Sequence, residues 1–171
     1  MWKRVLRLFK HRWASDADRT LPAPVLQRLQ TRVQASEQKH SGEICLYVEA
    51  GLPNSYLLRA SDIASLTRER ALSQFGKLRV WDTAHNNGVL VYLLLAEHAI
   101  ELVADRGINQ HVSPQVWQAM VQHLSAALQA GDFEQGLVQA VDAVTAVLVQ
   151  YFPLEVGAIK TNALPDRPSL G

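Results

Sequence analysis

The chain has 171 residues, of which 48% are hydrophobic and 19% are charged, and its formal net charge is +1. This length and composition predict one globular domain that is large enough to bury a core. The single cysteine, Cys45, excludes an internal disulfide and any multi-cysteine metal site. No stretch approaches the roughly 20 apolar residues that span a bilayer, and no secretory signal is recognisable, so we expect a cytoplasmic protein.

Residues 1–13, MWKRVLRLFKHRW, form a basic arm with five lysines and arginines and no acidic residue. On a helix, its tryptophans, Val5, Leu6 and Phe9 share one face, and most of the basic residues lie opposite. This pattern is typical of a helix that lies on an anionic membrane surface, and it also suits a first helix whose apolar face packs on the domain. Nucleic acid is not expected as a partner, because the rest of the chain has no further basic patch.

The remaining elements are predicted in chain order. Residues 14–20 form a polar linker, and the domain proper covers 21–153. A helix begins near Pro22 and Pro24 and ends before Gly42. A strand over 42–50 and a turn at 51–55 follow this helix. Residues 56–79 are predicted to be helical, and Ser61 or Asp62 is expected to cap the main helix. Strands over 89–95 and 99–104 come next. A loop over 105–112 leads to two further helices, which start at Ser113 and near Asp132, and Pro153 ends the second. We expect the tail, residues 154–171, to be loosely ordered.

This order of elements predicts a three-layer α/β/α sandwich in which helices flank a small mixed sheet. The helical crossover makes the first two strands parallel, and the short turn at 96–98 makes the third antiparallel. The end of the third strand must then return to the edge where Asn86, Asn87 and Gly88 enter the second. Three segments should therefore meet at one edge: Glu43, residues 82–88 and residues 105–107.

The polar groups expected at this edge are carboxylates, amides, a histidine and a guanidinium. Carboxylate and amide oxygens suit a hard cation such as Ca²⁺ or Mg²⁺, and a neighbouring arginine could help to hold a phosphate. The alternative is purely structural, because Asn-Asn-Gly is good turn chemistry and an acid beside an arginine often only caps backbone groups. The candidate metal ligands are Asp82 and Asp105, and the candidate ligand-binding residues are Glu43, Asn86, Asn87 and Arg106.

The sequence contains none of the common signatures for nucleotide, zinc or serine-hydrolase sites, so we assign no catalytic residue and expect no organic cofactor. Cys45 lies inside a strand without a basic neighbour and is predicted to be a buried, unreactive residue. His40 precedes Glu43 and could approach the edge.

The motifs SGEICLYVE, NNGVLVYLLL with its partner AIELVADRGI, and AGDFEQGLVQAVDAV together resemble the TPM domain family over about residues 20–152. The HSGEI and LPDRP segments are similar to a bacterial subgroup of short, soluble members. The resemblance implies an α/β/α sandwich. It also implies divalent-metal binding or acid phosphatase activity, as attributed to some members, or assistance in the assembly of membrane complexes, as attributed to others. The matching positions for a cation site are Asp82, Asn86, Asn87 and Asp105.

Two functional hypotheses follow. The first is a non-enzymatic interaction or assembly module that carries a divalent-cation site, binds an anionic membrane surface through residues 1–13, and has an unidentified protein partner. The second is a metal-dependent acid phosphatase acting on phosphomonoesters. We favour the first, because no residue has the setting of a nucleophile or an activated base. The family's glycine-rich loop is also reduced here to ADRGINQHVS, with one glycine, Gly107.

Overall fold

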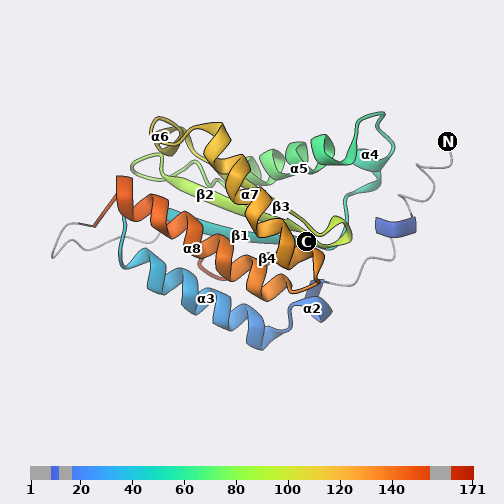
Figure 1. Ribbon diagram of the computed structural model, residues 1–171, viewed down its shortest axis with the longest axis horizontal. Helices are drawn as coiled ribbons and strands as arrows, with labels where there is room; N and C mark the ends of the chain where they lie inside the picture. The colour runs from blue at the N-terminus through green and yellow to red at the C-terminus, as the bar shows by residue number, and fades with distance from the viewer. Residues whose placement is uncertain (1–8, 12–16, 155–162) are drawn as a thin grey trace.

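The computed structural model describes residues 9–11, 17–154 and 163–171. A four-stranded mixed sheet with the order β3-β2-β1-β4 is covered by helices on both faces (Figure 1). The strands are β1 (Glu43–Glu49), β2 (Gly88–Leu94), β3 (Ala99–Ala104) and β4 (Ser169–Leu170). The helices are α2 (Ala17–Thr20), α3 (Ala23–Glu37), α4 (Asn54–Leu57), α5 (Ile63–Lys77), α6 (Arg106–Asn109), α7 (Pro114–Gln129) and α8 (Phe133–Tyr151), with a 3-10 turn η1 (Leu95–Glu97). The predicted α/β/α sandwich is confirmed.

Strand pairing follows the predicted topology. β1 and β2 are parallel, with Glu43 opposite Gly88, and β2 and β3 are antiparallel, with Val89 opposite Ala104. The strands β1 and β2 are buried on both faces, which explains why their sequences are apolar at nearly every position. Because successive side chains of a strand project to opposite faces of the sheet, the core has two parts, one on each face.

One part of the core lies between the sheet and helices α3, α7 and α8, and the other lies between the sheet and α5. Helix α8 packs against both α3 and α7. Two ion pairs join α3 to α8 on the surface, Arg28–Glu134 and Arg32–Asp142. Since both pairs are exposed, the apolar contacts beneath them supply most of the stabilisation.

Helix ends agree with the capping residues in the sequence. The side chain of Asp62 accepts a hydrogen bond from the Ser65 N–H at 2.9 Å, and Asp132 accepts one from the Gln135 N–H at 3.1 Å. These bonds satisfy backbone donors that the first helical turn leaves open. Gly131, between α7 and α8, has φ +80° and so takes the left-handed conformation that glycine favours.

Four predictions of local structure were wrong. The helix predicted over 56–79 is divided into α4 and α5, and α4 begins inside the predicted turn 51–55. Residues 17–20 of the expected linker form α2, and part of the expected loop 105–112 forms α6. The tail that we expected to be loosely ordered includes β4, which pairs parallel with β1, and the side chain of Leu164 is buried in the core. Within the described residues, no helix combines the length and the apolar character needed to cross a membrane.

Candidate functional site at the sheet edge

The three segments that we expected to converge do meet, at the edge where β1 and β2 begin and β3 ends. The Asp105 N–H donates to the Gly88 carbonyl at 2.9 Å, and the Gly107 N–H donates to the Asn86 carbonyl at 2.9 Å. On the other side, the Glu43 N–H donates to the Asn87 carbonyl at 3.3 Å. Backbone hydrogen bonds therefore fix the asparagine loop between β1 and the β3–α6 junction.

Close backbone packing explains the glycines at this edge. A Cβ atom on Gly107 would lie 2.6 Å from the carbonyl oxygens of both His85 and Asn86, and one on Gly88 would lie 2.0 Å from the Val80 carbonyl oxygen. Asn86 itself has φ +52°, the left-handed conformation that asparagine tolerates better than most residues. Asn86 and Gly88 are thus explained by the backbone of the turn itself.

Buried side-chain oxygens in this region that accept no hydrogen bond from the described residues include the Asn87 Oδ1 and the Asp105 Oδ2. Asn87 is 1% exposed and Asp105 is 7% exposed. The other oxygen of Asp105, Oδ1, accepts the Arg106 N–H at 2.7 Å and so caps α6. Burying an oxygen without a donor costs on the order of 1–3 kcal/mol, so each of these atoms would gain from a bound donor or cation.

Glu43 and Asp105 are neighbours of Gly88 in the sheet. Glu43 is opposite Gly88 in β1, and Asp105 is bonded to Gly88 from the other side. Because laterally paired residues project to the same face, the carboxylates of Glu43 and Asp105 flank a position that has no side chain. Both residues are buried. Two buried carboxylates separated by a glycine form a negatively charged edge.

Arg106 and Asp82 have different settings. The Arg106 Nε donates to the Asn86 Oδ1 at 3.0 Å, which brings the guanidinium to the asparagine loop as predicted. Asp82 instead forms an ion pair with Arg79 at 2.5 Å, and its side chain is 51% exposed. No hydrogen bond or ion pair of the described residues joins Asp82 to the other predicted site residues.

Sequence analysis missed two hydroxyl side chains at this edge. The Asn87 Nδ2 donates to the Ser41 Oγ at 3.2 Å, and the Thr83 Oγ1 accepts the Asn87 N–H at 2.9 Å. Thr83 stands four residues before Asn87 and lay within the predicted segment 82–88, whereas Ser41, two residues before β1, lay outside the predicted segments. They position Asn87, whose Oδ1 remains available for a ligand.

His40 and Cys45 have structural settings. The His40 ring is fully buried between the Ser36 Oγ, 2.8 Å from Nε2, and the Gly42 carbonyl, 3.1 Å from Nδ1. Burial, together with the charge of Glu37, raises the pKa of the Cys45 thiol to about 12. As predicted, Cys45 is buried, and its thiol is protonated at neutral pH.

A second buried polar cluster lies at the opposite edge, where β1 and β2 end. The Arg70 guanidinium binds both oxygens of Glu49, and the Tyr92 hydroxyl donates to the Glu49 Oε2 at 2.7 Å. Burial and the nearby Glu49 charge raise the pKa of Tyr92, so its phenol remains a donor at neutral pH. Because these groups satisfy one another, this cluster stabilises the fold and offers no unpaired oxygen to a ligand.

Comparisons with known proteins agree with this fold. The family described as TPM domain matches residues 14–147. The BA42 protein from the psychrophilic bacterium Bizionia argentinensis, solved by NMR, is 28% identical with a TM-score of 0.71, over 88% of this chain and 95% of that one. The N-terminal domain of a P. gingivalis protein is 18% identical with a TM-score of 0.56, over 82% and 85%, and shares the fold. No curated protein matches the chain.

The family match covers most of the chain, including all residues of the candidate site, and confirms the resemblance seen in the sequence motifs. The chain belongs to the TPM domain family.

Proposed function

We propose that the protein is a non-enzymatic interaction module that binds Ca²⁺ or Mg²⁺ at the edge where β1 and β2 begin. The observation that carries this proposal is the buried Asp105 Oδ2, which accepts no hydrogen bond from the described residues. Hard divalent cations prefer carboxylate, amide and carbonyl oxygens together with water. The buried carboxylate of Glu43, beside Asp105 across Gly88, adds negative charge that favours a cation.

The donor set fits such an ion better than a transition metal. Among the described residues, no group of three or more His, Cys, Asp or Glu side chains is arranged to hold a metal. That arrangement is what Zn²⁺ or iron sites generally need, whereas Mg²⁺ is commonly held by one or two carboxylates and several waters. A cation here would connect the start of β1 to the start of α6 and so stiffen this edge.

Thermal unfolding in a series of Ca²⁺ and Mg²⁺ concentrations tests the cation site. A ligand at 100 times its Kd stabilises a protein by about 2.7 kcal/mol. For a domain of this size, that corresponds to a rise in Tm of roughly 5–11 °C. We expect Asp105→Asn to abolish the rise while keeping the α6 cap, because asparagine is also a good capping residue.

Asp82→Asn is the matched control, since it removes a carboxylate of the same loop that is exposed and paired with Arg79. We expect this variant to retain the full rise in Tm. An equal loss of the rise in both variants would show that Asp82 is a ligand as well, as the sequence predicted. No rise with either ion in the wild type would refute the cation site.

The alternative, a metal-dependent acid phosphatase, is favoured by one observation. Arg106 uses its Nε for Asn86, and no described residue accepts a hydrogen bond from its two terminal nitrogens, which could bind a phosphate. Hydrolysis of p-nitrophenyl phosphate with Mg²⁺ or Ca²⁺ distinguishes the two functions. Turnover that is lost in both Asp105→Asn and Arg106→Gln would replace the interaction module by an enzyme.

Membrane association through residues 1–13 is a further part of the proposal, and residues 1–8, 12 and 13 lie outside the described residues. The described end of the arm contacts the domain: the Lys10 Nζ and the His11 Nε2 lie 2.7 and 2.9 Å from the carboxylate of Glu97. The arm would thus be fixed at the opposite sheet edge from the cation site. Flotation with anionic vesicles tests it, and equal binding by the full chain and by a chain starting at Ala14 would refute it.

A further inference from the structure

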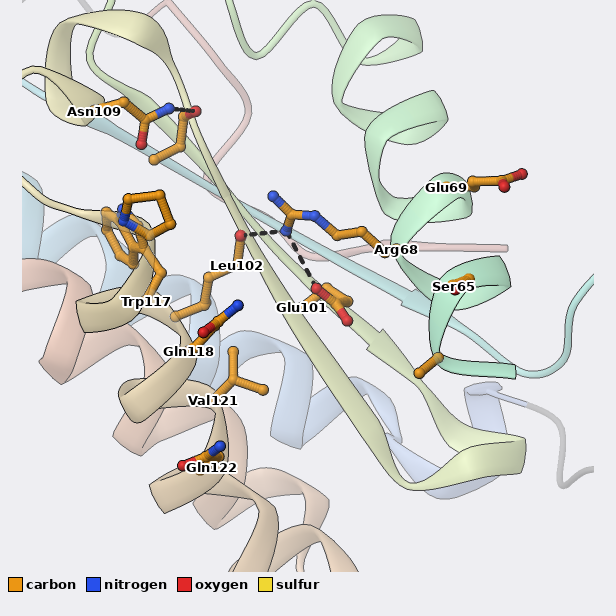
Figure 2. A pocket seen from close by; sticks show the side chains of 13 residues that line it. Ser65, Arg68, Glu69, Glu101, Leu102, Asn109, Trp117, Gln118, Val121 and Gln122 are labelled. Atoms are coloured by element: carbon orange, nitrogen blue, oxygen red, sulfur yellow. Dashed lines mark hydrogen bonds and ion pairs between the residues drawn. The ribbon is translucent and has the colours of Figure 1, made fainter. Parts of the chain in front are cut away.

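A cleft of about 800 Å³ runs along the open edge of the sheet, between α5 and α7. Its floor is β3, the outermost strand on this side, and the side chains of both helices form its walls (Figure 2). At the other edge, β4 already pairs with β1. β3, with six residues against two in β4, is therefore the longer of the two edge strands and offers more backbone to a further strand.

The backbone of β3 presents hydrogen-bonding groups to the cleft. Because the Asp105 N–H points to β2, the alternation of an antiparallel strand turns the N–H and carbonyl groups of Ala104 and Leu102 outward. The Leu102 carbonyl accepts a hydrogen bond from the Arg68 Nη1 at 2.7 Å, and the Ala104 carbonyl accepts one from the Asn109 Nδ2 at 2.8 Å. The two outward N–H groups donate to no acceptor among the described residues.

Side chains thus take the place of a missing strand. Arg68 reaches from α5 across the cleft and bonds both the Leu102 carbonyl and, at 3.2 Å, the Glu101 carboxylate (Figure 2). Burial raises the pKa of Glu101, and the charge of Arg68 opposes this shift. Arg68 is 45% exposed, so it can turn outward into solvent.

The α7 wall supplies another unused donor. The indole Nε1 of Trp117 is buried and has no acceptor among the described residues. Gln118 and Gln122 continue the same wall with side-chain amides, which can donate to and accept from a peptide backbone. The cleft therefore combines outward N–H groups on its floor with polar groups along one side.

We propose that an extended segment of a partner polypeptide binds in this cleft as an additional strand beside β3, displacing Arg68 from the Leu102 carbonyl. Regularly spaced backbone donors and acceptors are matched by an extended backbone, and this is the basis of strand addition in peptide recognition. A second copy of the chain fits less well, because its own β3 would arrive flanked by α5 and α7.

The partner is unidentified, so the probe is a phage-displayed library of random dodecapeptides selected against the full chain. Affinities of the selected peptides are then measured by fluorescence anisotropy. We expect Gln118→Arg, which fills the cleft from α7, to weaken binding at least 30-fold. Gln27→Arg, the same change at an exposed position of α3, should leave the affinity within twofold. Arg68→Ala should bind about tenfold more tightly, because no charge-assisted hydrogen bond must be broken first.

Strand addition also has a signature that other binding modes lack. N-methylation of the peptide at successive residues should abolish binding at alternate positions only, because every second N–H faces β3. The absence of binders from both the wild type and Arg68→Ala would overturn the proposal. Binders that are indifferent to Gln118→Arg, or whose N-methyl scan shows no alternation, would overturn it as well.

This proposal supplies a protein-binding surface for the interaction module, but it does not depend on the cation site. We expect Asp105→Asn to bind the selected peptides with unchanged affinity. Failure of the cation site and failure of the peptide cleft are therefore separately observable.

Discussion

Gly107→Ala tests how tightly the asparagine loop is packed against the start of α6. The added Cβ would lie 2.6 Å from the backbone oxygens of His85 and Asn86, well inside van der Waals contact. Both neighbours are backbone atoms, and the Asn86 oxygen accepts the Gly107 N–H, so the two segments must move apart. Such overpacking costs about 1–3 kcal/mol. Alanine also reduces the conformational entropy of the unfolded chain, which offsets about 0.4–1 kcal/mol of this loss.

The expected net change is therefore a loss of about 1–2 kcal/mol, which lowers Tm by roughly 2–8 °C in a domain of this size. Gly76→Ala in α5 is the matched control, because a Cβ there would have no atom within 4 Å. It should gain roughly 0.4–1 kcal/mol. Both are measured by urea unfolding and thermal melts. A Gly107→Ala protein that is as stable as Gly76→Ala would refute the close packing of the two segments.

Three further predictions concern charges and the thiol. Arg70→Met leaves the Glu49 carboxylate buried without its partner and should cost about 3–5 kcal/mol in urea unfolding, and Glu49→Gln in the same chain should recover much of the loss. Cys45 should react with a thiol reagent at pH 8 only as fast as the protein unfolds, because burial raises its pKa to about 12; labelling of the folded state at the rate of a free thiol would contradict this. Burial raises the pKa of Glu97, but hydrogen bonds from His11 and Lys10 outweigh it, so the pKa lies below its ordinary value of 4.5. Glu97 therefore contributes its full stabilisation above pH 4.5, and this contribution is lost as the pH falls below that value. The difference in unfolding free energy between wild type and Glu97→Gln should shrink accordingly, and a difference that grows on acidification would show the opposite sign.

Hydrophobic pattern was enough to predict the order of the main elements and the direction of the strands. The apolar run at 89–95 and the turn after it fix an antiparallel neighbour, and the helical crossover fixes a parallel one. Those two facts brought Asp105 to Gly88, which is the geometric basis of the candidate site. Short elements escaped prediction, because a two-residue strand such as β4 has no periodicity to detect.

Side-chain partners inside loops could not be predicted from the sequence. Asp82 and Asp105 looked equivalent as candidate ligands, yet Asp82 pairs with Arg79 whereas Asp105 leaves one buried oxygen without a donor. That distinction depends on how each loop folds locally. The peptide cleft was missed for a similar reason, since only the packing of α5 and α7 on the sheet brings Arg68 across β3 to Leu102.

The most direct measurement of the central claim is a crystal structure of the full chain grown with saturating Ca²⁺. We predict one calcium ion at the start of β2, bound by the Asp105 Oδ2 and the Glu43 carboxylate at about 2.3–2.6 Å, with waters completing its coordination. A structure in which both carboxylates bond only to protein donors or to water, with no ion at this edge, would contradict the account.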